Sequence, residues 1–397
     1  MFSSAAIQTL RRARRVIKEM KLHGIEQSDD MRAHARHFLQ DLIEGRMESL
    51  IDDTLQELDI QKIPDRRNGT YQRNFLSELG NLDLCVPRTR LFSACTVLQK
   101  YARRAPQIDQ VILSGFLLGL STRKVGQTLV SLLGEKISAS TVSRVAKTLD
   151  TSVACFHKRP LADNYNVLMF DGVVLSRKTG AGAERRPVLV ALGVREDGKK
   201  EIIDFQVSAS ESQAEWERFL CDLYRRGLHG ESLAAITVDG GKGLLAALPF
   251  VYGKIPVQRC VVHKTRNLQN KCRKADWPVM KRGLHRIFEA ANEVKARSAA
   301  RRFVDRWGQS YPEVAKSLRQ DLDALLQFFM FKDPTWRKAT RSTNAIERRF
   351  REVRRRTRPM GVFSNKTSME RILFAVFMNE NKSQKVDTAF LMLTHNN

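Results

Sequence analysis

The sequence has few cysteines and no long apolar run. Its six cysteines in 397 residues show no paired spacing, so they do not make the framework of a small disulfide-stabilised domain, and they fit a reducing compartment. The longest uncharged apolar stretches, such as residues 115–120, fall well short of the roughly 18 residues that a membrane-spanning helix needs. These scarcities exclude a disulfide-rich secreted scaffold and indicate that no membrane is a partner.

Acidic residues are scarce relative to basic ones. There are 43 Asp and Glu against 68 Lys and Arg, which gives a formal net charge of +25. Hydrophobic residues make up 42% of the chain, which is enough for packed cores and excludes disorder throughout. At roughly 150 residues per domain, the length predicts two or three modules. The charge indicates a polyanionic partner.

The basic excess is concentrated in three segments. Residues 10–24 hold six basic and one acidic side chain, residues 264–306 hold thirteen and four, and residues 337–358 hold ten and two. One such segment alone is typical of a solvated helix face, but three together favour contacts with a phosphate backbone. The first segment also has the composition of a transit peptide, although its apolar residues suit an amphipathic helix better.

Residues 1–105 are predicted to be a mainly helical, DNA-binding region. Apolar residues recur at intervals of three and four from residue 31 to residue 58, which is the period of a helix. One short strand is predicted at residues 82–86, and Pro87 is expected to end it.

Residues 106–155 are predicted to form a helix-turn-helix DNA-binding domain. One apolar helix ends near Gly119, a second starts after Ser121, and a third follows the break at Gly134. Short donors and basic side chains of the second and third helices suit a DNA major groove. The candidate DNA contacts are Arg123, Ser140, Thr141 and Arg144. An ordinary helical hairpin has the same pattern, and the basic context favours DNA binding.

Residues 160–270 change to strand patterns. Strands are predicted at residues 166–175, 186–194, 201–207, 233–238 and 257–262. One helix follows the third strand, with Ser212 and Glu215 as a capping box, and another follows Asp239. The predicted order is therefore three strands, a helix, a strand, a helix and a strand. This is the order of a ribonuclease H-like core, an α/β fold with a mixed sheet.

This order brings two carboxylates to one edge of the sheet, because Asp171 lies in the first strand and Asp239 ends its neighbour. Mg²⁺ prefers oxygen ligands, and phosphoryl transfer uses two such ions, so a third carboxylate is expected from a later helix. Glu347 is the candidate. Each acid has an alternative: Asp171 with Gly172 is a hairpin-turn signal, Asp239 suits a helix cap, and Glu347 follows Asn344 at capping-box distance. The coincidence of all three favours catalysis.

The motifs form an ordered series along the chain. Its members are residues 169–173, 238–244, 258–263 with 266–268, 336–338, 342–348 and 363–365, and upstream residues 67–69, 86–88, 120–125 and 137–143. Over roughly residues 65–380 this series resembles the Mutator-type transposases of bacterial insertion sequences, the insertion-sequence-256 family. One departure is Gly172, where many relatives carry the similarly small Ala.

The resemblance implies that Asp171, Asp239 and Glu347 form a DDE triad. They would bind two Mg²⁺ ions, with Mn²⁺ as an alternative, for water-driven nicking and strand transfer. The implied partners are double-stranded DNA, namely the terminal inverted repeats of the element and the target DNA, and a second copy of the chain in a homodimer on DNA. A circular intermediate and a bacterial, cytoplasmic, nucleoid-associated location are implied too. Residues 271–335 are then a helical insertion, and residues 336–397 complete the core.

Cys260 and His263 are similar to the Cys-x-x-His signature of that family. With Cys272 and His285 they would make a zinc site, but the gaps fit no common zinc module. We expect the pair to orient the sheet edge near the catalytic cleft.

Arginines surround the helix that carries Glu347. A helix cannot bury a face of Arg, so phosphate contacts are expected from Arg348, Arg351 and Arg355, and also from Arg266. Arg351 is alternatively spaced for an ion pair with Glu347.

The predicted function is that of an Mg²⁺-dependent DNA transposase. A domesticated, non-catalytic DNA-binding protein is the alternative, and a structure-specific nuclease without strand transfer is a third. Three carboxylates within a basic groove would repel phosphate unless a metal were bound, which favours the enzyme. Inverted repeats flanking the coding region would separate the transposase from the domesticated protein.

Overall fold

A computed structural model describes residues 28–98, 103–118, 120–133, 136–179, 182–358, 363 and 365–383. The chain divides into two compact units, residues 1–146 and residues 147–397. The first basic segment, Gly119, Gly134 and the tip of the turn at residues 180–181 lie outside the described residues. Within the part that is described, no helix combines the length and the apolar character needed to cross a membrane.

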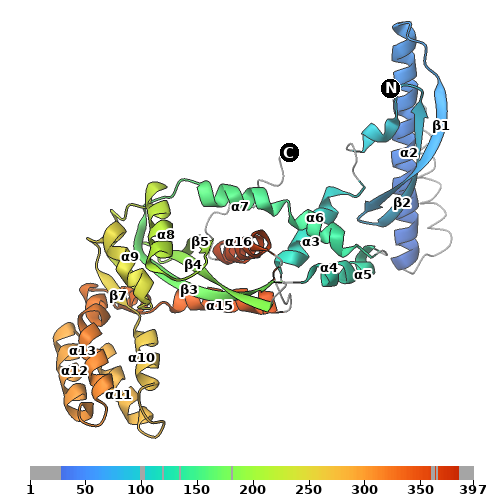
Figure 1. The fold of residues 1–397 in the computed structure, drawn as a ribbon. Coiled ribbons are helices and arrows are strands. Elements are labelled where there is room, and N and C mark those ends of the chain that lie inside the picture. The colour runs from blue at the N-terminus through green and yellow to red at the C-terminus, as the bar shows by residue number, and fades with distance from the viewer. Residues whose placement is uncertain are drawn as a thin grey trace. The chain divides into compact units, whose positions relative to one another are not determined.

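The first unit begins with a long helix that packs on a β-hairpin. Its elements are α2 (Ser28–Ile60), β1 (Arg67–Ser77), β2 (Gly80–Thr89) and the 3-10 helix η1 (Ala94–Val97) (Figure 1). Met47 and Ile51 of α2 pack with Leu82 and Leu84 of β2 in one buried cluster. The helix predicted over residues 31–58 is confirmed.

The strand predicted at residues 82–86 is present as part of β2, but the expectation of only one strand in this region was wrong, because β1 pairs with it in antiparallel fashion. Most of β1 is polar and exposed, so it carries no apolar alternation from which a strand could be recognised. The second strand continues through Pro87 to Thr89. A proline is tolerated there because a two-stranded sheet leaves one side of each strand unpaired.

The rest of the first unit is a group of short helices: α3 (Pro106–Leu117), α4 (Thr122–Thr128), α5 (Val130–Leu133) and α6 (Ala139–Ala146). Ser121 caps α4 as predicted, since its side chain accepts a hydrogen bond from the Lys124 N–H. The second helix of the prediction is split, with Leu129 between α4 and α5. Val125 and Val142 are buried where α4 and α6 meet α3.

The second unit contains a mixed five-stranded sheet in the order β5-β4-β3-β6-β7. The strands are β3 (Tyr165–Thr179), β4 (Gly182–Arg195), β5 (Lys200–Val207), β6 (Ala235–Val238) and β7 (Val257–Arg259). β4 runs antiparallel to β3 and β5, whereas β3, β6 and β7 are parallel. The mixed α/β class is confirmed, and the order is compatible with a ribonuclease H-like core. The last strand was predicted too long, because Cys260 already caps a helix.

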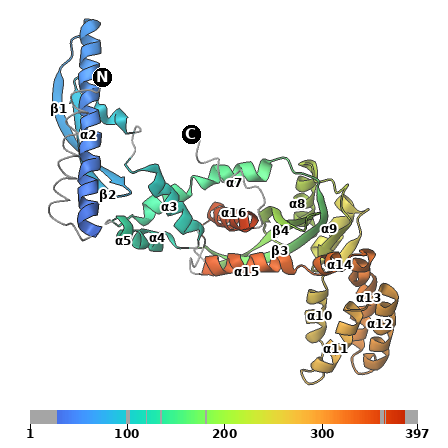
Figure 2. The same cartoon turned by 180° about the vertical axis from the view of Figure 1, so that it is seen from behind.

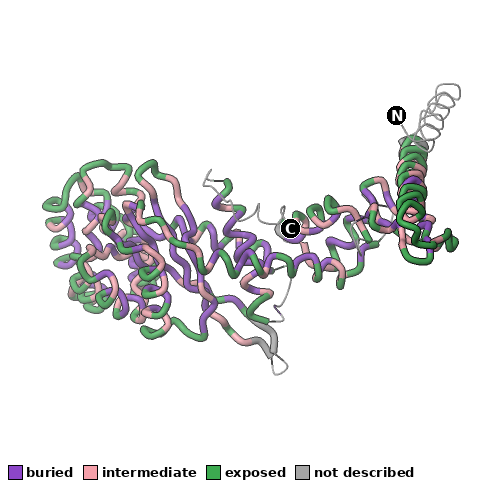
Figure 3. The backbone as a smooth tube through the Cα atoms, turned by 90° about the horizontal axis from the view of Figure 1, so that it is seen from above, coloured by how far each residue is buried: buried purple, intermediate pink, exposed green. Residues whose placement is uncertain are grey.

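Helices cover both faces of this sheet (Figures 1 and 2). On one face, α8 (Gln213–Arg225) and α9 (Lys242–Tyr252) share a core with Phe170 and Leu189 of the sheet. On the other, α7 (Leu149–Lys158) and α16 (Lys366–Ser383) pack through Phe156, Phe205 and Phe374. The strands are accordingly mostly buried in Figure 3. The predicted helix-turn-helix domain extended to residue 155, but residues 149–158 form α7 in this second unit.

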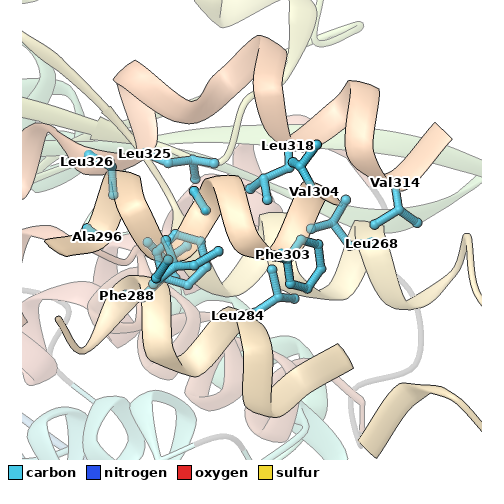
Figure 4. Close-up of a cluster of buried hydrophobic side chains, with 14 of the residues drawn as sticks. Leu268, Leu284, Phe288, Ala296, Phe303, Val304, Val314, Leu318, Leu325 and Leu326 are labelled. Atoms are coloured by element: carbon cyan, nitrogen blue, oxygen red, sulfur yellow. The ribbon is translucent and has the colours of Figure 1, made fainter. Parts of the chain in front are cut away.

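The segment predicted as a helical insertion has a core of its own. After α10 (Val261–Gln269) come α11 (Trp277–Phe288), α12 (Glu293–Trp307), α13 (Pro312–Leu326) and the 3-10 helix η2 (Gln327–Met330). Figure 4 shows Leu284, Phe288, Phe303 and Leu318 meeting between these helices. The chain then returns to the sheet through α14 (Pro334–Thr340) and α15 (Asn344–Thr357).

Candidate active site

Asp171 lies in the middle of β3. It pairs with Val190 of β4, and the strand continues to Thr179. The Asp171 side chain is 5% exposed, and its Oδ1 accepts a 2.8 Å hydrogen bond from the Gly172 N–H. The alternative of a hairpin turn at Asp171 and Gly172 is therefore wrong, because the strand does not turn there.

Asp239 follows the last residue of β6. Val238 pairs with Phe170 in parallel register, so Asp239, just after the end of β6, lies level with Asp171 within β3. The N-cap of α9 is Gly241, and Oδ1 of Asp239 accepts a 2.8 Å hydrogen bond from the Gly241 N–H. Asp239 is thus next to the helix start without being its cap residue, and its other carboxylate oxygen remains for a different role.

Glu347 lies in the first turn of α15. The N-cap residue Thr343 makes no side-chain cap hydrogen bond, so the alternative of a capping box is not formed. Oε1 of Glu347 lies 3.1 Å from Nε2 of His263, and Oε2 lies 3.9 Å from the Arg266 guanidinium. Glu347 therefore pairs with two cations of α10, and not with Arg351 as its spacing also allowed.

The three carboxylates act on one another electrostatically. The pKa of Asp171 is raised to about 7: burial is the largest cause and the negative charges of Asp239 and Glu347 act in the same direction, while His263 and the Gly172 N–H oppose them. Like charges raise a carboxyl pKa only at short range. The fold thus brings together the three acids that the sequence selected from positions far apart in the chain.

Cys260 and His263 connect the end of β7 to the start of α15. Cys260 is fully buried, and its Sγ accepts a 3.3 Å hydrogen bond from the Thr343 N–H. Nδ1 of His263 lies 3.3 Å from Oγ1 of Thr343. The hydrogen bond with Cys260 raises the pKa of His263 to about 9, with the charges of Asp171 and Glu347 acting in the same direction and burial opposing them. His263 is therefore an imidazolium at neutral pH, placed against Glu347.

The carboxylate oxygens of Asp171, Asp239 and Glu347 are the type of ligand that a hard cation prefers, although they do not form a complete coordination site. Among the described residues, no three His, Cys, Asp or Glu side chains are grouped tightly enough to hold a metal ion as they stand. Oε1 of Glu347 is nevertheless buried and accepts no hydrogen bond there, in spite of its distance to His263. A buried carboxylate oxygen without a donor, beside two further carboxylates, is an arrangement that a divalent cation would stabilise.

Sequence reasoning missed Glu211, a fourth acid at this site. It lies in the loop between β5 and α8, and burial followed by the charge of Asp239 raises its pKa. A Cβ added at Gly172 would lie 2.7 Å from its Oε1. No sequence signal could identify it, because it lies in a short polar loop and meets β3 only through the tertiary fold.

The arginines of α15 do not all face solvent. Arg348, Arg351 and Arg355 are exposed, as is Arg266 of α10, so the four candidates for phosphate contact are accessible. Arg349 and Arg356, however, are each 6% exposed. The expectation that this helix cannot bury Arg was wrong, because the long aliphatic stems of both residues lie on the face that also buries Ile346, Phe350 and Val353.

Of the candidate DNA contacts of the first unit, Arg123 lies at the start of α4, Ser140 and Thr141 at the start of α6, and Arg144 in the last turn of α6. Arg123, Ser140 and Arg144 are exposed, and Thr141 is half-buried. Ser138 accepts a 3.1 Å hydrogen bond from the Thr141 N–H and lies 2.9 Å from the hydroxyls of Ser140 and Thr141. The two hydroxyls thus take part in capping α6, while the two arginine side chains remain directed to solvent.

Comparisons with known proteins agree with these motifs. Residues 7–385 match the family described as "Transposase, Mutator family". The chain is 32% identical to the transposase for insertion sequence element IS905 of Lactococcus lactis, over 82% of each chain. It is 34% identical to that for IS1081 of Mycobacterium tuberculosis, over 79% of this chain and 76% of the relative. It is 31% identical to that for IS256 in transposon Tn4001 of Staphylococcus aureus, over 87% and 89%.

Proposed function

The chain belongs to the Mutator family of transposases, and on this premise we propose that it is a DDE-type DNA transposase of an insertion sequence. In this proposal the second unit is a ribonuclease H-like catalytic core that cleaves and transfers DNA strands at the terminal inverted repeats. The observation that carries it is the convergence of Asp171, Asp239 and Glu347, in which burial and then the charges of the other two carboxylates raise the pKa of Asp171.

The three carboxylates would hold Mg²⁺, or Mn²⁺, at two positions. Bound there, the ions would supply activation of the attacking water or 3′-hydroxyl and stabilisation of the leaving oxygen. Asp171 and Asp239 come from the rigid parallel pair β3 and β6, which keeps their separation constant. Glu347 comes from α15, so the position of this helix determines whether the third carboxylate reaches the other two.

The surrounding residues would perform the remaining tasks. His263 holds Glu347 by its positive charge, and Thr343 fixes the orientation of the imidazole from the other ring nitrogen. The exposed Arg266, Arg348, Arg351 and Arg355 would neutralise phosphates of the strand beside the carboxylates. The helices of the first unit, with Arg123 and Arg144, would recognise the terminal repeat. A homodimer that holds both element ends completes the proposal.

The test is cleavage and strand transfer by the purified chain on labelled element ends, with and without Mg²⁺. Asp171→Asn, Asp239→Asn and Glu347→Gln should each abolish both reactions and leave binding of the ends largely intact. The matched control is Asp197→Asn, which removes an exposed carboxylate in the β4–β5 turn and should keep full activity.

Strand transfer at the normal rate by any of the three triad variants would contradict the proposal. Specific binding of the ends without Mg²⁺-dependent cleavage by the unmodified chain would support a non-catalytic DNA-binding protein instead. Cleavage without joining would indicate a nuclease.

A further inference from the structure

A cavity of about 590 Å³ lies beside α15, on a different side of this helix from the carboxylates. Ala345, Arg348 and Arg349 line it, whereas Glu347 of the same turn is directed to His263. The other walls come from α10, α11, α14 and the start of β5. We call this cavity the α15 pocket.

The α15 pocket is strongly basic. Six Lys and Arg side chains line it: Lys200, Lys281, Lys338, Arg341, Arg348 and Arg349. The one carboxylate in its wall, Glu289, lies 2.7 Å from Arg341 and is already engaged in that ion pair. The other five cations therefore have no carboxylate partner in the pocket wall.

Arg349 is the buried member of this set. Its side chain is 6% exposed, and its Nη1 donates a 3.0 Å hydrogen bond to the Ala345 carbonyl. Its Nε is buried and has no acceptor among the described residues. A buried guanidinium N–H without a partner costs free energy unless an anion completes its hydrogen bonds.

The cations also repel one another. Burial lowers the pKa of Lys200, and the positive charges of Arg349 and Arg348 lower it further. Burial likewise lowers the pKa of Arg349; the negative charge of Glu380, which is not part of the pocket wall, opposes this, and the positive charge of Arg348 adds to it. Clustered positive charges repel one another, so a bound anion would stabilise this cluster of Lys and Arg side chains.

We propose that the α15 pocket binds a backbone phosphate of the DNA strand that enters the carboxylate site. This inference rests on the proposed transposase function and adds a defined phosphate-binding site to it. Guanidinium and ammonium groups are the donors that proteins use for phosphate. The pocket also receives the N-terminal residues Asn344 and Ala345 of α15, a helix of 14 residues whose dipole favours an anion.

DNA is favoured over a free anion by the position of the pocket. Arg348 lies in the same turn of α15 as Glu347, so a strand that is bound at the carboxylates and crosses this helix would reach the lining. The apolar wall, including Val261, Leu284 and Phe288, strengthens the charge–charge attraction by excluding water. The volume exceeds that needed for one phosphate group and accommodates a sugar–phosphate segment.

The test combines a pocket variant with DNA that lacks one charge at a time. The double variant Lys281→Gln/Lys338→Gln changes two exposed lining residues, and Lys295→Gln/Lys316→Gln changes two exposed lysines of α12 and α13 as the matched control. Element ends carrying one neutral methylphosphonate at each backbone position in turn are titrated without Mg²⁺, and the dissociation constant is measured. The unmodified chain should bind more weakly when the methylphosphonate is at one or two adjacent positions near the cleavage site.

In the pocket variant these same positions should no longer affect binding, whereas the control variant should keep the original pattern. The slope of log affinity against log salt should become shallower by about 0.9 for each phosphate that the pocket variant no longer neutralises. An unchanged pattern in the pocket variant would overturn the inference. A second result would also overturn it. If inorganic phosphate raises the melting temperature of the unmodified chain but not of the pocket variant, and the pocket variant keeps the original methylphosphonate pattern, the pocket is a site for free anions and not for DNA.

These outcomes are separate from those that test the function. If the unmodified chain cleaves element ends but the pocket variant keeps the pattern, the pocket inference fails and the transposase stands. If the pocket variant loses the methylphosphonate pattern as expected but the unmodified chain shows no Mg²⁺-dependent cleavage, the catalytic proposal fails and the phosphate site stands. If no DNA binds at all, both fail.

Discussion

The carboxylate of Glu211 occupies the space that a side chain at Gly172 would fill. A Cβ at that position would lie 2.7 Å from Oε1 and 3.0 Å from Cδ of Glu211. Such a contact is closer than non-bonded atoms tolerate, so one of the two groups would have to move. Gly172 is therefore matched by a glutamate packed against the same strand, one residue from Asp171.

We expect Gly172→Ala to displace Glu211 at a small cost in stability, less than about 1 kcal/mol, because the atoms in the way belong to the end of a flexible side chain. The same substitution in a Glu211→Ala background should cost nothing. Denaturant unfolding of the two single variants and the double variant measures the coupling free energy of this pair. Strictly additive free energies would show that the two side chains do not compete for the space.

His263→Gln should slow strand cleavage by about 10- to 100-fold, the usual effect of removing a group that orients a metal ligand. The imidazolium that lies 3.1 Å from Glu347 would be replaced by a neutral amide. Single-turnover rates as a function of Mg²⁺ concentration are the measurement, and the loss should be partly restored at high Mg²⁺. His229→Gln, which changes an exposed histidine outside the site, is the control. A normal rate for His263→Gln at all Mg²⁺ concentrations would remove His263 from this role.

Asp204 should make the second unit sensitive to acid. Its side chain is 1% exposed and accepts hydrogen bonds from Nδ1 of His157 at 2.7 Å and from Arg226. Burial acts to raise the pKa of Asp204, but the hydrogen bonds and charges of His157 and Arg226 outweigh it and lower the pKa below the ordinary value. A depressed folded-state pKa adds stability above the unfolded value of about 3.9, and this stability is lost as the pH falls through the folded-state pKa.

Asp204→Asn should accordingly lower the free energy of unfolding by about 3 kcal/mol at pH 7, because the nearly buried Arg226 guanidinium loses one of its two carboxylate partners and keeps only Asp222. The difference from the unmodified chain should shrink as the pH falls below about 4. Urea titrations at both pH values test this, with the exposed Asp305→Asn as the control. A difference that does not change with pH would contradict the assignment to an ionised Asp204.

Gln258 should hold the helical insertion to the edge of the sheet. This fully buried side chain of β7 donates to the Leu325 carbonyl at 3.0 Å and accepts from the Phe328 N–H at 2.7 Å. Gln258→Leu would leave both backbone groups unsatisfied, at about 1–3 kcal/mol each. Hydrogen exchange should become faster around residues 325–330, while the exposed Gln269→Leu should leave it unchanged. Unchanged exchange in Gln258→Leu would show that other contacts hold this junction.

Much of the fold could be predicted because its signals are local. The nearly continuous apolar runs of residues 166–175 and 186–194 mark buried strands, and the Ser212 cap with Trp216 and Phe219 marks α8; the structure contains all of them. β1 could not be recognised from the sequence, because most of its residues are polar. Its extended backbone is stabilised by hydrogen bonds to the partner strand β2, which no local pattern reveals. Arg349 and Arg356 were misjudged for a similar reason, since the type of a side chain does not reveal which face of a helix becomes buried.

The sequence by itself determined the residue types of the site and their order: one carboxylate within a strand, a second at the end of the neighbouring strand, and a third on a basic helix. It could do so because strand and helix patterns depend on near neighbours in the chain. Only the tertiary structure decided which charges meet. The placement of His263 against Glu347, of Glu211 in the space beside Gly172, and of Lys200 beside Arg349 depends on contacts between segments far apart in the sequence. Electrostatic interactions act through space, so they are set by the packing of these segments rather than by their order.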